Sequence, residues 1–485
     1  MKLFLNNVGI IKNSEVKLDG LTVITGKNSS GKTTVGKTIY SLISAGNNTV
    51  EAFDESRRTY ICSQLNNIER LTQIRRIIRM RYDPPKENDV VSTTLWMLAM
   101  HRYNQLDVEE LLTYLFTLKS IFHELTPEQY KSFCLEYNKN READSYISNL
   151  ISIISENFYE WQKKVLEICQ MTLDITGDES AYYNFVKDRT VAYLNHEFNK
   201  QIRPISSRGA TARIVLVDLN QTIVDARIKS RNSAEFSKDS SFMYPYDRCI
   251  FIDNPFVIDR LQEVSEKSDS LRLSFEDRTS NTIITSDDIE SHDDILIRLL
   301  LESEKKNYFD DVEIQTRYKS VFEQINKIVP GEFLRGSNGF FYVTNGAKLS
   351  VNNLATGSKM FFIIKKLLLN GLLNDGTVLV LDEPESHLHP DWINKFAEML
   401  VVLVENINVN VLLTTHSPNL LLALSVYTKQ YEMFHKTNFY LAEIGNDGSS
   451  HIKDIKENIN EGYAHLSLPL VEMNIKLKKM ATEEN

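Results

Sequence analysis

The stretch that decides the fold runs from Leu21 to Thr34 and reads LTVITGKNSSGKTT. Its first five residues are apolar or β-branched, as in a short buried strand, and the next eight fit the phosphate-binding pattern GxxxxGK[ST]. Gly26 and Gly31 allow the tight turn that points backbone amides at an anion. The apolar pattern of Val35–Ile43 predicts a helix whose positive N-terminal end faces the same anion. Strand, loop and helix together predict a P-loop.

The P-loop residues are expected to share the binding of ATP and Mg²⁺. Lys32 should reach the β- and γ-phosphates, and the hydroxyl of Thr33 should ligate Mg²⁺. The predicted nucleotide-binding residues are Gly26, Asn28, Ser29, Ser30, Gly31, Lys32, Thr33 and Thr34. ATP and Mg²⁺ are therefore the expected cofactors.

Two later strands end in residues that suit the same chemistry. The run Thr377–Leu381, TVLVL, predicts a strand buried on both faces. Acids at the end of such a strand are costly unless they serve a cation or a reaction, so Asp382 is expected to hold Mg²⁺ and Glu383 to act as general base. The strand Asn410–Thr415 ends at His416. We expect His416 to face the γ-phosphate beside Glu383, and a purely structural histidine is the alternative.

These motifs resemble those of the ABC/SMC superfamily of ATPase heads. The resemblance lies in the P-loop at Gly26–Thr33, the acids Asp382 and Glu383, and His416 in a switch position. More narrowly, LDEPESHLHP at 381–390 and TTHSP at 414–418 resemble the OLD-type ATPases of bacterial anti-phage defence. Septu ATPases of the PtuA type, with their retron-associated relatives, are the nearest resemblance, and the PARIS ATPase is a nearby one. The similarity is strongest over residues 1–45 and 340–475.

The resemblance implies that a second protomer completes the ATP site. An LSGGQ-like signature at the start of a helix would cap the γ-phosphate of the partner's nucleotide, and LATGS at 354–358, before a helical run at 359–369, takes its place. Ala355 stands at the position of the phosphate-contacting serine, and Thr356 replaces a glycine. The predicted signature residues, acting in trans, are Ala355, Thr356, Gly357 and Ser358. This departure from the family pattern predicts slow hydrolysis.

The superfamily also places a Gln-bearing, metal-linking loop after a strand between the two halves. The run RCIFIDN at 248–254 is an apolar strand that ends in polar residues before Pro255. Asp253 or Asn254 is the candidate for that position. A plain turn from strand to loop is the equal alternative.

The composition is that of an ordinary globular protein. Hydrophobic residues make up 42% and charged residues 25% of the 485 residues, enough to bury a sizeable core. A net charge of -10 argues against a surface that is basic all over. The four cysteines form no CxxC pair, which argues against a zinc site or a disulfide framework. No stretch approaches the about 20 apolar residues of a membrane span, so we expect a cytoplasmic protein without a membrane partner.

The expected fold class is α/β: an ABC-type P-loop ATPase head split by a large, mostly helical insertion. The expected parts are an N-terminal half at 1–50, a helical insertion at 51–195, a β-rich return at 196–255, a helical subdomain at 256–345, a C-terminal half at 346–430, and a strand with a helical tail at 431–485. The apolar stripe that predicts helix in the insertion is Leu65, Ile68, Leu71, Ile74 and Ile78. Residues 211–218 and 222–229 predict a hairpin, and residues 438–443 predict an edge strand.

Two charged segments have competing interpretations. The basic cluster is Arg57, Arg58, Arg70, Arg75, Arg76, Arg79 and Arg81. Arginine pairs well with phosphate, so nucleic acid is one candidate partner, but we favour a solvated helix face or a protein interface. The acidic stretch Thr285–Asp294 is interpreted as a solvated turn, because its carboxylates lack the partners of a metal centre.

Three functions from different classes follow. In the favoured one, the chain is an ATP-hydrolysing sensor or regulatory subunit of a bacterial anti-phage defence complex. It would form a homodimer or higher homo-oligomer and control a separate effector, a nuclease or a toxin, because the segment after His416 is too short for a fused Toprim nuclease. The alternatives are an SMC-like DNA-repair ATPase and an ATP-binding scaffold with little turnover. The sequence has no long heptad-rich coiled coil, which favours the first.

Overall fold

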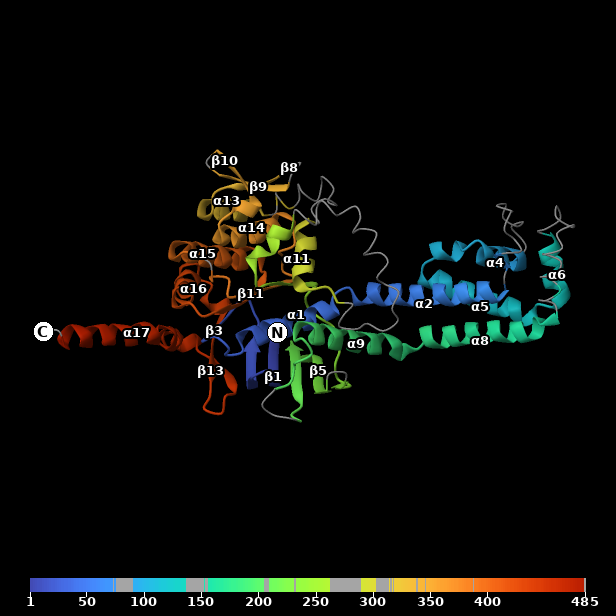
Figure 1. The fold of residues 1–485 in the computed structure, drawn as a ribbon, viewed down its shortest axis with the longest axis horizontal. Coiled ribbons are helices and arrows are strands. Elements are labelled where there is room, and N and C mark those ends of the chain that lie inside the picture. The colour runs from blue at the N-terminus through green and yellow to red at the C-terminus, as the bar shows by residue number, and fades with distance from the viewer. Residues whose placement is uncertain are drawn as a thin grey trace. The chain divides into compact units, whose positions relative to one another are not determined.

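The structure, a computed structural model, describes residues 1–72, 74–75, 90–136, 152, 156–204, 209–230, 233–261, 289–301, 314, 316, 318–336, 339–344, 346–386 and 388–483. These residues form two compact units (Figure 1). The first unit contains residues 1–47 and the described residues after 186, and the second contains the described residues of 48–186. The chain therefore leaves the first unit and later returns to it.

The first unit is built on an 11-stranded sheet of mixed direction. The strand order is β6-β5-β4-β1-β2-β14-β13-β3-β12-β11-β7. The strands are β1 Lys2–Val8, β2 Ile11–Lys17, β3 Leu21–Gly26, β4 Ala212–Asp218, β5 Gln221–Ser230, β6 Ser233–Phe236, β7 Arg248–Ile252, β11 Thr377–Asp382, β12 Asn410–Thr415, β13 Thr437–Ile444 and β14 Ser450–Asp454.

Five neighbouring strands of this sheet, β13, β3, β12, β11 and β7, run parallel to one another. The carboxyl ends of parallel strands meet at one edge of a sheet, where ligands of open α/β sheets bind. This edge carries the loop after Gly26, Asp382 at the end of β11, His416 after β12 and Asp253 after β7. The strand order therefore gathers the residues that the sequence motifs single out.

Helices cover both faces of the parallel strands. In β11, Val378 and Val380 pack into one hydrophobic core with α1, whereas Leu379 and Leu381 pack into another with α14, α15 and α16 (Figure 1). Successive side chains of a strand point to opposite faces, so both faces are buried. The helices of this unit are α1 Lys32–Gly46, the end of α9 Glu179–Glu197, η2 Pro255–Arg260, α11 His292–Leu301, α13 Lys319–Ile328, η5 Val351–Asn353, α14 Thr356–Leu369, α15 Pro390–Ile407, α16 Pro418–Gln430, η6 Phe434–Lys436, η7 Lys456–Asn458 and α17 Ile459–Glu483.

The hairpin expected near residues 211–229 is confirmed as β4 and β5, which pair antiparallel. Its two-residue turn, Leu219 and Asn220, has φ angles of 44° and 68°. Positive φ at both positions is the conformation of the tight turns that match the twist of paired strands. The hairpin continues the sheet beyond β1.

Two expectations for the later part of the chain differ from the structure. The expected helical pattern of 256–345 holds for η2, α11 and α13, but Glu332–Gly336 and Gly339–Thr344 form strands β8 and β9, which join β10 Ala347–Ser350 in a 3-stranded antiparallel sheet. Aromatic and β-branched residues in Phe340–Thr344, between glycines, favour strand there. The edge strand expected at 438–443 is instead the interior strand β13, which pairs with β3 and β14. Its residues from Thr437 to Ala442 are all buried, as in a central strand.

The second unit is helical in its described residues. Its helices are α2 Thr49–Thr72, α4 Val90–Ala99, η1 Arg102–Gln105, α5 Val108–Glu124, α6 Pro127–Glu136, α8 Phe158–Thr176 and the start of α9. Leu65, Ile68 and Ile74 of the expected stripe are fully buried, but Leu71 is 37% exposed. Thr72 takes its place and is fully buried, because the helical period that passes through 65 and 68 reaches 72. Ile78 lies outside the described residues.

The expected fold class is confirmed. An α/β head with the P-loop strand in a parallel core is interrupted by a mostly helical unit. The P-loop lies before the interruption, and the strands that carry Asp382 and His416 lie after it.

Candidate nucleotide-binding site

The loop between β3 and α1 turns through two glycines in backbone conformations that other residues rarely adopt. Gly26 has a φ of 153° and Gly31 a φ of 89°. A Cβ on Gly26 would lie 2.5 Å from the backbone oxygen of Ala442, so no side chain fits there. Gly31 is also the N-cap of α1 and supplies no side-chain cap. The positive end of α1 therefore faces the loop and is available to an anion.

Lys32 lies beneath this loop, with a side chain only 3% exposed. Its Nζ donates hydrogen bonds to the backbone oxygens of Gly26, at 3.0 Å, and Lys27, at 2.9 Å. Nζ also lies 3.2 Å from Oε1 of Glu383. The ammonium group thus stands between the phosphate-binding loop and the proposed general base.

Asp382 is held by hydroxyl groups from two other elements. Thr33 Oγ1 donates a 2.8 Å hydrogen bond to Oδ2, and Thr414 Oγ1 donates one to Oδ1. Burial raises the pKa of Asp382, and the nearby charges of Glu383 and Asp253 raise it further. A cation at this point would relieve both effects. Thr33 and Asp382, the expected Mg²⁺ residues, are therefore together and chemically suited to a divalent cation.

Glu383 and His416 face each other at the ends of neighbouring strands. Glu383 has a φ of 50°, a conformation that is strained for a residue with a side chain. Its N–H donates to the backbone oxygen and to Oγ1 of Thr414, both at 3.1 Å, which holds this turn. Nδ1 of His416 lies 3.2 Å from Oε2 of Glu383. The structure thus brings the two predicted catalytic residues together.

Glu385 is a further residue of this site that the sequence interpretation did not single out. It is 5% exposed, and its Oε1 accepts hydrogen bonds from Thr415 Oγ1 and from the backbone N–H of His416, the latter at 3.1 Å. Its Oε2 is buried without a hydrogen-bond partner among the described residues. Burial raises the pKa of this carboxyl. The third acid of DEPE was the available signal, because an acid so close to a buried strand needs a partner.

A pocket of about 570 Å³ opens over the P-loop. It is lined by Asn28–Thr34 and by both acids, Asp382 and Glu383. The buried hydroxyl of Ser30, which also lines it, has no hydrogen-bond partner among the described residues. A phosphate group in the pocket would give that hydroxyl a partner, so the residues fit a nucleoside triphosphate. Gly26, His416 and the signature residues are not among the lining residues.

The far wall of the pocket comes from segments that carried no motif. Gly9 and Ile10, from the turn between β1 and β2, line one part of it. Glu197, Phe198 and Gln201, at the end of α9 and just after it, line another. Lys37 Nζ of α1 donates a 3.0 Å hydrogen bond to the backbone oxygen of Glu197. The end of α9, where the chain re-enters the first unit, therefore forms part of the wall of the nucleotide pocket.

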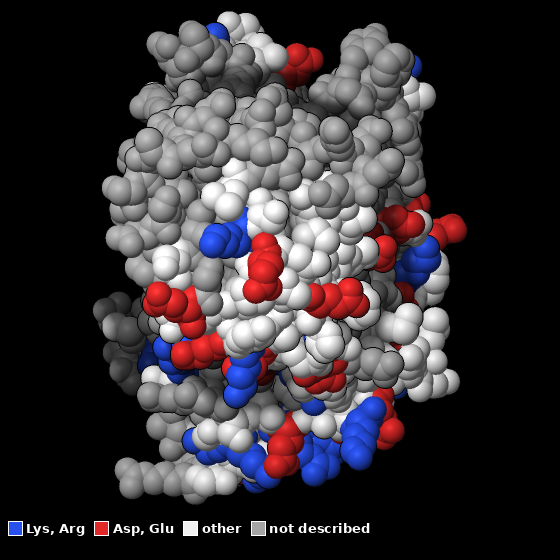
Figure 2. Space-filling view, turned by 90° about the vertical axis from the view of Figure 1, so that its right-hand side faces the viewer, with Lys and Arg blue, Asp and Glu red and all other residues white. Residues whose placement is uncertain are grey.

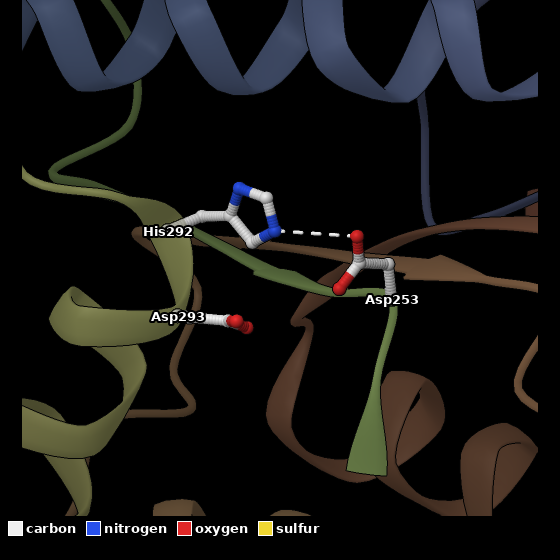
Figure 3. Close-up of side chains that lie close together, drawn as sticks. All are labelled: Asp253, His292 and Asp293. Atoms are coloured by element: carbon white, nitrogen blue, oxygen red, sulfur yellow. Dashed lines mark ion pairs between the residues drawn. The ribbon is translucent and has the colours of Figure 1, made fainter. Parts of the chain in front are cut away.

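The two candidates for the metal-linking position have different surroundings. The side-chain oxygen of Asn254 accepts a 2.9 Å hydrogen bond from the N–H of Phe256 and caps η2. Asp253 instead faces the ring of His292, 3.3 Å from Nε2 (Figure 3). Burial alone would lower the pKa of His292, but hydrogen bonds and charges from Asp253 and Glu197 raise it to about 10. The same contact outweighs burial and lowers the pKa of Asp253.

The signature candidates form the start of α14. Ala355 is the exposed N-cap and offers no side-chain cap, and Thr356–Ser358 make the first turn. The next residue, Lys359, is buried and forms an ion pair with Asp259 of η2. The start of α14 is thus fixed to the loop that follows Asp253. The four signature candidates lie outside this chain's own pocket.

Of the four described arginines of the basic cluster, Arg57 and Arg58 are engaged within their own unit, whereas Arg70 and Arg75 are exposed. Arg57 pairs with Asp54 at 3.3 Å, and Arg58 pairs with Glu55 at 3.5 Å. Arg58 also donates to the backbone oxygen of Leu106 at 3.2 Å. Figure 2 shows a face on which Lys and Arg alternate with Asp and Glu in its described part. These pairs favour a solvated helix face, while Arg76, Arg79 and Arg81 lie outside the described residues.

The sheet order and the site define the class: a P-loop nucleotide-binding protein with an ABC-type head. A family model described as AAA ATPase domain matches residues 1–421. The chain therefore belongs to this AAA ATPase domain family. None of the helices that the structure describes is long and apolar enough to cross a membrane.

Among characterised sequences, the chain is similar to the "Retron Vc95 probable ATPase" of Vibrio cholerae serotype O1 biovar El Tor. The two are 22% identical over 351 residues, which is 61% of this chain and 65% of the relative. The chain thus matches less than two thirds of that relative's length.

Among solved structures, the chain is similar to an SMC head domain from Thermotoga maritima. The TM-score is 0.34 at 11% identity, over 93% of this chain and 97% of that one. It is also similar to an Smc head domain with a coiled coil and joint from Pyrococcus yayanosii, with a TM-score of 0.34 at 11% identity, over 96% and 99% of the two chains.

Proposed function

We propose that this chain hydrolyses ATP and acts as the regulatory subunit of a bacterial anti-phage defence complex. The observation that carries the enzymatic part is the Thr33–Asp382 hydrogen bond, with Glu383 and Lys32 beside it. It assembles the P-loop, a cation site and a candidate base around one pocket. Membership of an ATPase family supports the same activity.

In the proposed mechanism, the amides of the loop and Lys32 hold the phosphates. Thr33 and Asp382 would hold Mg²⁺, which supplies charge neutralisation at the β- and γ-oxygens when bound. Glu383 orients the attacking water and accepts its proton. His416, 3.2 Å from Glu383, restricts that carboxylate on its other side. When the nucleotide binds, Lys32 would leave Glu383 and contact the phosphates instead. The carboxylate of Glu383 would then be available to act as the base.

A second copy of the chain is proposed to complete the site through its signature segment, as a homodimer or a higher homo-oligomer. Thr356 and Ser358 retain hydroxyl groups in the first turn of α14, and the helix end retains its dipole. Ala355 contributes no hydroxyl. This supports slow hydrolysis, and an ATP-binding scaffold with little turnover is the second candidate function on the same observation.

The defence role is supported by the motif resemblance to Septu-type ATPases and by the similarity to a retron ATPase. We propose that the effector, a nuclease or a toxin, is a separate protein that the ATPase state holds or releases. The charge pairs around Arg57 and Arg58 give no support to direct nucleic-acid binding by those two residues.

Affinity purification from the native host tests this role. Tagged wild-type chain and a Glu383→Gln variant, which should retain ATP, would be purified and their bound protein and nucleic acid identified. The proposal predicts a stoichiometric nuclease or toxin subunit whose amount differs between the two samples. Recovery of DNA ends without an effector protein would instead support an SMC-like repair ATPase and would overturn the defence role.

A further inference from the structure

A second polar cluster lies beside the nucleotide pocket. Ligand atoms of Asp253, His292 and Asp293 all lie within 4.8 Å of one another (Figure 3). Asp253 follows the parallel strand β7, while His292 and Asp293 form the start of α11. The part of the acidic stretch at 285–288 lies outside the described residues, but its end enters α11, where Asp253 supplies a partner that the stretch lacks within its own sequence.

The ring of His292 is oriented by carboxylates on both of its nitrogens. Nδ1 lies 3.2 Å from Oε2 of Glu197, whose side chain is 2% exposed, and Nε2 lies 3.3 Å from Oδ2 of Asp253. Histidines that bind metals almost always donate their second ring N–H to a carboxylate or a backbone carbonyl, which fixes the tautomer. Glu197 is placed to do this, so Nε2 would face the ion.

One separation within the cluster also suits a bound ion. Two ligand atoms that are each about 2.0–2.1 Å from a tetrahedral ion are about 3.3 Å apart. The separation of Nε2 and Oδ2 matches this value. The carboxylate of Asp293 offers a third ligand atom within 4.8 Å of the other two.

We propose that Asp253, His292 and Asp293 bind a divalent transition-metal ion of the Zn²⁺ class, distinct from the Mg²⁺ that accompanies ATP. An imidazole ligand favours such ions over Mg²⁺, which prefers oxygen ligands only. Three protein ligands leave a coordination position for water. Asp253 is exposed and the other two residues are partly buried, which allows an ion to enter from solvent.

A metal-free alternative uses the same contacts. A protonated His292 could bridge Glu197 and Asp253 as an imidazolium. The ion therefore has to displace the proton at Nε2, and its binding releases that proton to solvent.

The ion would connect the cluster to the nucleotide pocket. It would link β7 to α11 directly and, through the contact of His292 with Glu197, reach the pocket wall at the end of α9. Asp253 is also close enough to Asp382 for their charges to interact. A transition-metal ion bound at Asp253 would thus change the charge close to Asp382, the proposed Mg²⁺ ligand.

Metal uptake by the full-length chain without nucleotide tests the proposal independently of ATP hydrolysis. Chain stripped with a chelator would be titrated with Zn²⁺ by calorimetry and analysed for metal content. The variant is Asp293→Asn, and the matched control is Asp294→Asn. Asp294 is the next residue along, its carboxylate is held by Arg260 and Ser291, and it is not one of the three clustered residues.

The proposal predicts about one tightly bound Zn²⁺ per chain in the wild type and in Asp294→Asn. Asp293→Asn should bind it about 10–100-fold more weakly, with the metal-free melting temperature near that of the control. No tight uptake by the wild type, or equal affinity in the two variants, would overturn the proposal and leave the imidazolium bridge. ATP binding by the wild type is measured separately, in Mg²⁺ without Zn²⁺. ATP binding without Zn²⁺ uptake would overturn the proposed metal site alone and leave the nucleotide site intact.

Discussion

Thr33 Oγ1 donates a 2.8 Å hydrogen bond to Asp382 Oδ2, joining residues that are 349 positions apart. The bond links the first turn of α1 to the end of β11. Because β3 and β11 both neighbour β12 in a parallel arrangement, their carboxyl ends reach the same edge of the sheet. The helical unit interrupts the sequence between these parts without interrupting the site.

Replacing Asp382 with Asn should stabilise the metal-free chain and abolish its response to Mg²⁺. The pKa of Asp382 is raised in the folded chain, so the folded state favours the protonated carboxyl. The group's contribution to stability is present below its unfolded pKa and is lost as pH rises through its folded pKa. At neutral pH the neutral Asn escapes this loss, and for a chain of 485 residues we expect the melting temperature to rise by about 1 °C per kcal/mol gained.

Thermal melts of the wild type and Asp382→Asn, with and without Mg²⁺ and ATP, measure both effects. The wild type should gain stability from Mg-ATP and the variant should gain far less. A variant that melts lower than the wild type at neutral pH and still responds fully to Mg²⁺ contradicts this assignment.

A methyl group at Gly26 should damage both the fold and nucleotide binding. Its Cβ would lie 2.5 Å from the backbone oxygen of Ala442, at a φ of 153°. We expect Gly26→Ala to cost about 1–3 kcal/mol and to weaken ATP binding. The control is Gly448→Ala, which also has a positive φ but no atom within 4 Å of the added carbon. Chemical denaturation measures the free energy of unfolding of both variants. Equal losses of stability would mean that backbone strain, and not the contact with Ala442, destabilises Gly26→Ala.

Restoring a hydroxyl at the signature should speed turnover. Ala355 is the N-cap of α14 and makes no side-chain cap, and serine is a favoured N-cap residue worth about 1 kcal/mol over alanine. If the start of α14 contacts the partner's γ-phosphate, Ala355→Ser should raise kcat severalfold. Ala347→Ser, on the exposed strand β10, is the control. Steady-state phosphate release at saturating ATP measures this increase in kcat. An unchanged kcat would argue against a signature role for residue 355.

Glu385 should act as a positioning residue for His416. Its Oε1 accepts from Thr415 and from the N–H of His416, and Gln could still accept both. We therefore expect Glu385→Gln to keep activity within a few-fold. Glu385→Ala should lower kcat by about tenfold or more at little change in KM, because a loosened His416 loop misplaces Glu383. A higher KM for ATP with an unchanged kcat would show that Glu385 acts on nucleotide binding instead.

Much of the central site could be predicted from the sequence because its signals are local. The P-loop combines a strand, two glycines and a helix within one stretch, and the acids follow a strand that is apolar throughout. Both patterns depend on backbone periodicity and on the cost of burying charge, which a single sequence displays. The strands, and the meeting of Asp382 with Thr33, followed from them.

The remaining parts depend on contacts between distant segments. His292 seemed solvated because Asp253 and Glu197 lie far away in sequence and come near only through the sheet and the return of α9. The interior place of β13 depends on β14, which pairs on its other side. Leu71 was assigned to the buried stripe because it is apolar, although helical geometry places Thr72 there. The pocket wall from residues 197–201 carries no motif at all.

The central claim is that Glu383 activates water for ATP hydrolysis in this pocket, and single-turnover phosphate release tests it most directly. Wild type and Glu383→Gln would be loaded with ATP, their affinities measured by equilibrium binding, and hydrolysis started with Mg²⁺. The account predicts that Glu383→Gln binds ATP at least as tightly and releases phosphate about 10²–10⁴-fold more slowly. Phosphate release at the wild-type rate by Glu383→Gln, with ATP bound equally, would contradict the account.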